Sequence, residues 1–185
     1  MATNLDLEEQ EQLAELKHFW KTYGNLITWL LILVFGAYAA WNGYQYWQRQ
    51  QAIQAAALFD EVDKAVQSGD PARIERSFGD MKERYGGTTY AKQAALVAAR
   101  GLQERGKSEA ARSALTWVVE QASDDAYRAL ATLRLVGLLI QDKAYDDALK
   151  RLDGSFLAEF AGLVADRKGD VLALQGKTRE AATAY

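Results

Sequence analysis

The sequence predicts an all-α protein in which a single transmembrane helix is followed by a tetratricopeptide-like α-solenoid of helix hairpins. Three observations predict this fold class. Residues 22–48 carry no charge, the apolar residues beyond them recur at helical spacing, and helix-breaking turns recur every 34 to 37 residues. The chain therefore divides into an acidic tail (1–21), a signal-anchor helix (22–48) and a helical domain (49–185).

Composition excludes several classes of protein. The 185 residues contain no Cys and only one His, His18, so disulfides, thiolate metal sites and His-rich zinc sites are ruled out. The net charge of −3 arises entirely before residue 49, and the rest of the chain has 20 acidic and 20 basic residues. Such a balance is not that of a nucleic-acid-binding protein. The acidic residues of the tail are Asp6, Glu8, Glu9, Glu11 and Glu15.

The 27 uncharged residues between Lys21 and Arg49 are long enough to cross a membrane. As a helix they extend about 40 Å, more than the ~30 Å hydrocarbon core of a bilayer. Aromatic residues border the apolar centre, as they do at membrane interfaces. They are Trp20, Tyr23 and Trp29 at one end, and Trp41, Tyr44, Tyr46 and Trp47 at the other.

Two alternatives to a membrane anchor remain at this stage. One is a buried core helix. The other is a signal peptide cleaved at Ala37-Tyr38-Ala39, which the long acidic tail and the continued apolar run make less favourable. Basic residues are balanced on the two sides, so charge does not predict orientation. Gly36 and Ala40 are small residues four apart that would let another membrane helix approach, or would simply face lipid.

Helices and their ends follow from apolar spacing and from capping residues. The first helix of the domain is expected to continue from the membrane segment. The second begins at Asp70-Pro71 and ends at Gly86-Gly87 through a positive φ. Further helices are expected near 90–105, capped by Thr88-Thr89, and near 108–121, capped by Ser108.

The remaining helices follow the same rules. Ser123 or Asp124 opens a fifth helix, which is apolar nearly all round and is expected in the middle of the stack. A short helix containing Tyr145, Ala148, Leu149 and Leu152 follows. Gly154-Ser155 then ends this helix and caps the next one.

The turns predict a repeat. Gly69-Asp70, Gly106-Lys107, Asp142-Lys143 and Gly176-Lys177 each join a longer helix to a following one. A period near 34 residues is that of the tetratricopeptide repeat, whose units bury their apolar faces by stacking. The repeat-ending proline is absent and Trp117 lies on a second helix, so an irregular helical bundle is the alternative.

Residues suited to chemistry are few. The carboxylate clusters, Asp60-Glu61-Asp63, Asp124-Asp125 and Asp146-Asp147, fit capping and solvation better than acid–base or Mg²⁺ roles. Gly101-x-x-x-x-Gly106-Lys107-Ser108 matches a P-loop literally, but no strand precedes it. We expect no cofactor, no metal site and no enzymatic activity.

A set of basic residues predicts a partner-binding surface. Arg100, Arg134 and Lys168 are 34 residues apart in succession, on the first helices of successive repeats. First helices line the concave face of a tetratricopeptide stack, where a basic ladder would hold carboxylates or carbonyls of an extended partner. The alternative is that these residues are surface charges paired with neighbouring acids.

The whole chain resembles the YfgM family of bacterial inner-membrane proteins. The acidic tail, the aromatic-bordered span and the irregular helix pairs carry the resemblance, together with residues 160–177. Its most specific elements are Gly169-Asp170-Val171, Gln175-Gly176-Lys177 and Glu180-Ala181. The last repeat ends at Ala184-Tyr185, whereas family members run on further, so the domain is expected to lack its C-terminal cap.

The resemblance implies a function. It implies an ancillary subunit of the SecYEG translocon that works with the periplasmic chaperone PpiD on newly translocated secretory or outer-membrane proteins. It also implies an inner-membrane location, with the tail in the cytoplasm and the domain in the periplasm. The alternatives are a scaffold for signalling, division or envelope assembly, and an enzyme or regulator subunit dependent on a metal or nucleotide.

Overall fold

The computed structural model describes the backbone of residues 7–185 and the side chains of residues 12–185. Over this range the chain is helical and has no strand. It divides into two compact units, Met1–Gln50 and Gln51–Tyr185. The predicted tail falls partly beyond this description: Asp6 lies outside the described residues, as do the side chains of Glu8, Glu9 and Glu11.

The first helix, α1 (Leu7–Ser68), continues without a break from the predicted membrane segment into the helical domain, as expected. It is long and apolar enough to cross a membrane. Only 6% of its most apolar 18-residue window is buried, so it is not the core helix of this fold. Exposed large side chains along it include Leu26, Trp29, Leu33, Phe35, Trp41 and Trp47.

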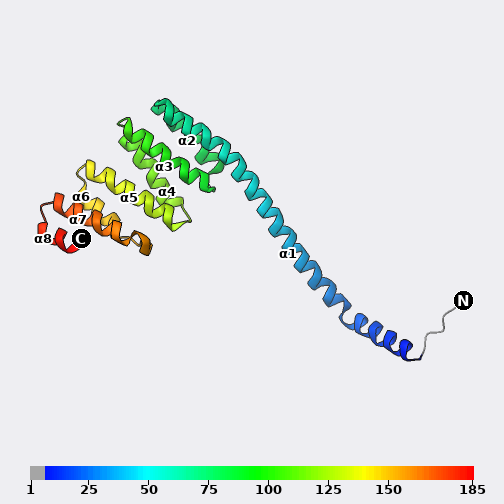
Figure 1. Ribbon diagram of the computed structural model, residues 1–185. Coiled ribbons are helices and arrows are strands. Elements are labelled where there is room, and N and C mark those ends of the chain that lie inside the picture. The colour runs from blue at the N-terminus through cyan, green and yellow to red at the C-terminus, as the bar shows by residue number, and fades with distance from the viewer. Residues whose placement is uncertain (1–6) are drawn as a thin grey trace. The chain divides into compact units, whose positions relative to one another are not determined.

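The second unit contains the end of α1 and a stack of shorter helices (Figure 1). From α2 to α8 each helix packs against the next in the chain, so successive hairpins bury one another's apolar faces. A 3₁₀ turn, η1 (Ala158–Phe160), precedes α7. The helices are α2 (Pro71–Tyr85), α3 (Thr89–Glu104), α4 (Ser108–Gln121), α5 (Asp125–Gln141), α6 (Tyr145–Leu152), α7 (Ala161–Leu174) and α8 (Thr178–Ala184).

One turn geometry recurs between the helices of each pair. Gly69, Gly106, Lys143 and Gly176 have φ values of 73°, 73°, 58° and 78°, in the left-handed region that usually requires glycine. In the last three turns a leucine carbonyl accepts the N–H group of the residue five positions on, as in a Schellman motif. These bonds run from Lys107 to Leu102, from Ala144 to Leu139 and from Lys177 to Leu172.

Three predicted caps are confirmed. The side chains of Asp70, Thr88 and Asp124 accept hydrogen bonds from the backbone N–H groups at the starts of α2, α3 and α5. The carboxylate or hydroxyl satisfies a donor that has no partner within the helix. The fifth helix also lies in the stack as predicted, with α4 and α6 packed against it.

Three other predictions about helix ends are wrong. Gly86 has φ −53°, not a positive φ; a Cβ there would lie 2.5 Å from the Lys82 carbonyl oxygen, so the glycine is needed for space. Lys107 occupies the cap of α4 because the turn at Gly106 makes Ser108 already helical. Ser155 does not cap α7, because η1 intervenes.

Candidate functional site

The predicted basic ladder lies on α3, α5 and α7, and each of its members contacts an oxygen of this chain. Arg100 Nε lies 2.9 Å from Glu104 Oε1. Arg134 Nη1 donates to the Leu96 carbonyl of α3 at 3.1 Å. Lys168 Nζ lies 2.7 Å from Asp153 Oδ1, just after α6.

These contacts are those of the alternative interpretation, in which the ladder consists of paired surface charges. Arg134 and Lys168 tie neighbouring elements of the stack together, while the Arg100 side chain is 76% exposed. A partner at Arg134 or Lys168 would have to replace an internal contact. Partner binding by the three residues stays a prediction.

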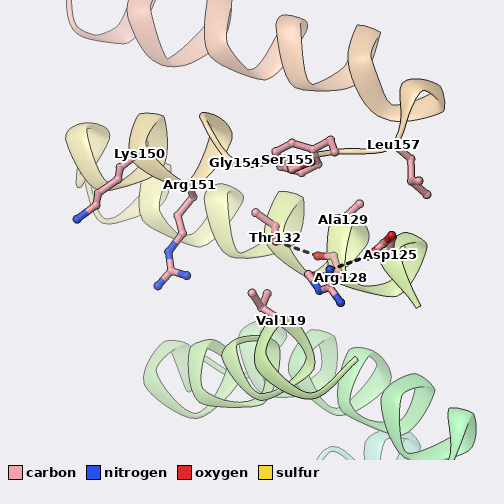
Figure 2. A pocket seen from close by; sticks show the side chains of 11 residues that line it. Val119, Asp125, Arg128, Ala129, Thr132, Lys150, Arg151, Gly154, Ser155 and Leu157 are labelled. Atoms are coloured by element: carbon pink, nitrogen blue, oxygen red, sulfur yellow. Dashed lines mark hydrogen bonds and ion pairs between the residues drawn. The ribbon is translucent and has the colours of Figure 1, made fainter. Parts of the chain in front are cut away.

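A more open surface lies between the second helices α4 and α6, with α5 as its floor. Two adjoining depressions of about 490 and 500 Å³ form it, and both are lined by Lys150 and Arg151 of α6. We call this surface the α4–α6 groove. Figure 2 shows the end next to segment 153–157, where Lys150 and Arg151 extend from α6 and Asp125 and Arg128 from α5.

The sequence of α5 explains why a groove forms. Five of the residues that line it recur every three to four positions and so share one helix face: Asp125, Arg128, Thr132, Leu135 and Leu139. Ala129 lies beside them. Ala129 and Thr132 are short side chains at the bottom of the depression, where they are 4% and 8% exposed. At one end the non-helical segment 153–157 adds Phe156 and Leu157 to the wall.

Some basic side chains in the groove pair with carboxylates of this chain, and others do not. Arg112 pairs with Asp142, and Arg128 pairs with Asp125 at 2.6 Å and donates to the Ala122 carbonyl at 2.7 Å. Lys150 and Arg151 differ, because no described carboxylate lies within 4.0 Å of either.

The membrane-contact prediction concerns Gly36 and Ala40, which share one face of α1. Both are exposed, and a Cβ added at Gly36 would meet no atom within 4 Å. The face is therefore open to a neighbouring helix or to lipid.

The carboxylate clusters occupy structural positions. Asp124 caps α5, Asp146 accepts from Gln175 Nε2 at 2.8 Å, and Asp63 accepts from Gln67 Nε2 at 2.6 Å. Among residues 12–185 no three His, Asp or Glu side chains gather as a metal site would require.

The P-loop look-alike is a packing feature. Gly101 lies inside α3, and a Cβ there would sit 2.8 Å from Val66 Cγ1 on α1 and 3.3 Å from Ile74 Cδ1 on α2. Glycine therefore allows α3 to approach both helices closely. Gly106 forms the left-handed turn described above.

Comparison with known proteins agrees with this architecture. A family model described as a tetratricopeptide repeat-like domain matches residues 17–185. A Neisseria gonorrhoeae protein named ancillary SecYEG translocon subunit is 37% identical over 97% of this chain and 86% of its own length. The chain belongs to the YfgM family. Two further YfgM relatives of the same name, from Haemophilus influenzae and Escherichia coli, are 29% and 28% identical over 95% and 96% of the chain, and over 89% and 85% of their own lengths. No solved structure matches the chain.

From its sequence, this YfgM protein was predicted to bind partners on the first helices, and the groove beside the second helices was not predicted. The available signal was the adjacent pair Lys150-Arg151 on a short amphipathic helix. Spacing alone does not reveal the groove, because its depth depends on the small residues of α5 and on the irregular segment 153–157.

Proposed function

We propose that this protein is a non-enzymatic, membrane-tethered interaction subunit of the SecYEG translocon. The observation that carries the proposal is the 37% identity, over 97% of the chain, to a protein named ancillary SecYEG translocon subunit. The helical architecture is consistent with it, because stacked helix pairs present extended surfaces to protein partners. The carboxylate clusters have capping and hydrogen-bonding roles, which supports an interaction role over a metal- or nucleotide-dependent one.

The finer role follows from the family resemblance. The protein assists the periplasmic chaperone PpiD with newly translocated secretory or outer-membrane proteins. α1 anchors it in the bacterial inner membrane, with the tail in the cytoplasm and residues 49–185 in the periplasm. Long domains translocate largely regardless of their charge, so the neutral domain is compatible with this orientation.

Contact with the translocon uses the membrane helix as well as the domain. Gly36 and Ala40 form the face through which α1 meets another membrane helix, because small side chains permit close backbone approach. The Arg100, Arg134 and Lys168 set is a second contact surface, in which a partner carboxylate would displace Glu104 or Asp153.

Photocrosslinking from within the membrane tests this proposal. A photoreactive residue replaces Ala40 in the full chain, and Tyr38, on the opposite side of the helix, is the matched control position. Adducts of SecY, SecE or SecG at position 40 and their depletion at position 38 are expected. Adducts with lipid alone, or with a signalling, division or envelope-assembly protein, would contradict the proposal and favour the scaffold alternative.

A further inference from the structure

The α4–α6 groove contains basic side chains that the fold does not use. Arg112 and Arg128 hold the ends of helices through their ion pairs and hydrogen bonds. Lys150 and Arg151 make no ion pair with any side chain of residues 12–185. Asp147 stands one turn earlier on α6 and also lines the groove, yet it lies more than 4.0 Å from both.

Apolar surface accompanies these charges. Leu157 is 37% exposed at the end next to segment 153–157, where Val119 of α4 and Phe156 also line the groove. At the other end Leu135 and Leu139 lie beneath the groove, where they are only 2% and 6% exposed. A ligand would therefore meet apolar contacts at the end next to segment 153–157 and cations on the α6 side.

The dimensions fit a peptide segment better than a small molecule. The floor extends from Asp125 to Leu139, 14 residues along α5, or about 21 Å at 1.5 Å per residue. That length accommodates about six residues of extended chain at about 3.3 Å each.

We propose that the α4–α6 groove binds an acidic segment of a partner protein, with carboxylates on Lys150 and Arg151 and an apolar residue against Phe156 and Leu157. Charge complementarity selects this occupant. Asp142 and Asp125 pair with Arg112 and Arg128, which leaves the two cations Lys150 and Arg151 against the single carboxylate of Asp147 in the groove. Guanidinium groups bind carboxylates through paired hydrogen bonds, which adds specificity. This inference rests on the proposed function, since it names the chemistry of a segment that an interaction subunit recognises.

Crosslinking from the groove tests the inference in intact cells. A photoreactive residue replaces Ser155, an exposed position that lines the groove in segment 153–157. The full chain is compared with K150E/R151E, with the neutral K150Q/R151Q, and with R73E/R76E, which places the same charge change at exposed positions of α2. Crosslinked segments are identified by mass spectrometry, and co-purification of SecYEG is measured in the same cells.

We expect adducts on segments in which Asp and Glu outnumber Lys and Arg. Their yield should fall at least about fivefold in K150E/R151E, fall less in K150Q/R151Q and stay unchanged in R73E/R76E, because reversal replaces attraction with repulsion. Neutral or basic segments, a second copy of this chain, lipid adducts alone, the absence of adducts or equal yields in all variants would overturn the inference.

The two readouts separate this inference from the proposed function. If SecYEG co-purifies while the groove yields no acidic adduct, the groove assignment alone is wrong. If SecYEG does not co-purify with the unaltered chain, the proposed function is wrong whatever the groove binds.

Discussion

The ammonium group of Lys92 lies 4.7 Å from the centre of the Trp117 ring and donates a hydrogen bond to the backbone carbonyl of Gly86. Lys92 belongs to α3, Trp117 to α4, and Gly86 ends α2, so one cation links three consecutive helices. The residue is only 7% exposed. Burial lowers the pKa of the Lys92 amine below its ordinary value of 10.5, because a poorly solvated site disfavours the charged form.

This pKa predicts a pH dependence of stability. Between the folded pKa and 10.5 the unfolded state binds more protons at Lys92 than the folded state, so this residue's contribution to stability rises with pH. It is complete above 10.5 and is lost as pH falls through the folded pKa. Urea unfolding gives the free energy of unfolding of the full chain and of K92M. The value for the unaltered chain minus that for K92M should therefore increase as the pH rises toward 10.5. If the difference in free energy of unfolding did not change with pH, or decreased as the pH rose, the lowered pKa of Lys92 would be contradicted.

Lys143 predicts a stabilising substitution. It is the only described non-glycine residue with a positive φ, 58°, where a β-carbon costs about 1–2 kcal/mol. Glycine removes this strain but increases the entropy of the unfolded chain by about 0.5–1 kcal/mol. K143G should raise the free energy of unfolding by about 0.5–1 kcal/mol. K107G is the control, because Lys107 has φ −88° in the equivalent turn, and it should lower the free energy of unfolding. Equal decreases in the free energy of unfolding of the two variants would show that Lys143 is not strained.

Gly101 predicts a destabilising substitution. An added methyl group would overlap Val66, 2.8 Å away, so G101A should lower the free energy of unfolding by about 1–3 kcal/mol. Gly137, in the middle of α5, has no atom within 4 Å of an added Cβ. G137A should therefore stabilise the protein by about 0.5–1 kcal/mol. Thermal unfolding monitored by circular dichroism compares the pair, and a stable G101A would show that α3 does not approach α1 this closely.

Membrane orientation can be tested with a single thiol, because the sequence contains no Cys. S113C places that thiol on an exposed residue of α4, and E15C places it on the tail. In cells permeable only at the outer membrane, a membrane-impermeant thiol reagent should label S113C and should label E15C only after the inner membrane is lysed. The reverse pattern would place the domain in the cytoplasm.

Much of the fold was predictable because its determinants are local. Apolar periodicity and the side chains of Asp70, Thr88 and Asp124 fix helices and their starts without reference to distant residues. The repeated turn was also visible, even where Lys143 replaces glycine. Local rules failed at Gly86, whose role is to make room for a neighbouring carbonyl oxygen.

The candidate partner-binding surfaces were less predictable because they depend on contacts between helices. Arg134 and Lys168 fit a ladder by spacing, but the Leu96 carbonyl and Asp153 that engage them come from other elements. Lys150 and Arg151 stand out only once the acids near them are known to lie more than 4.0 Å away. These contacts and distances depend on how the helices of the stack pack against one another.

Affinity purification tests the central claim most directly. The full chain, tagged at its C-terminus, is expressed at its natural level and isolated from inner membranes in a mild detergent. A variant in which an unrelated apolar helix replaces residues 22–48 controls for nonspecific membrane recovery. The account predicts that SecY, SecE and SecG co-purify in constant ratio with the unaltered chain and are reduced with the variant. Recovery of a different membrane assembly without SecYEG would contradict it.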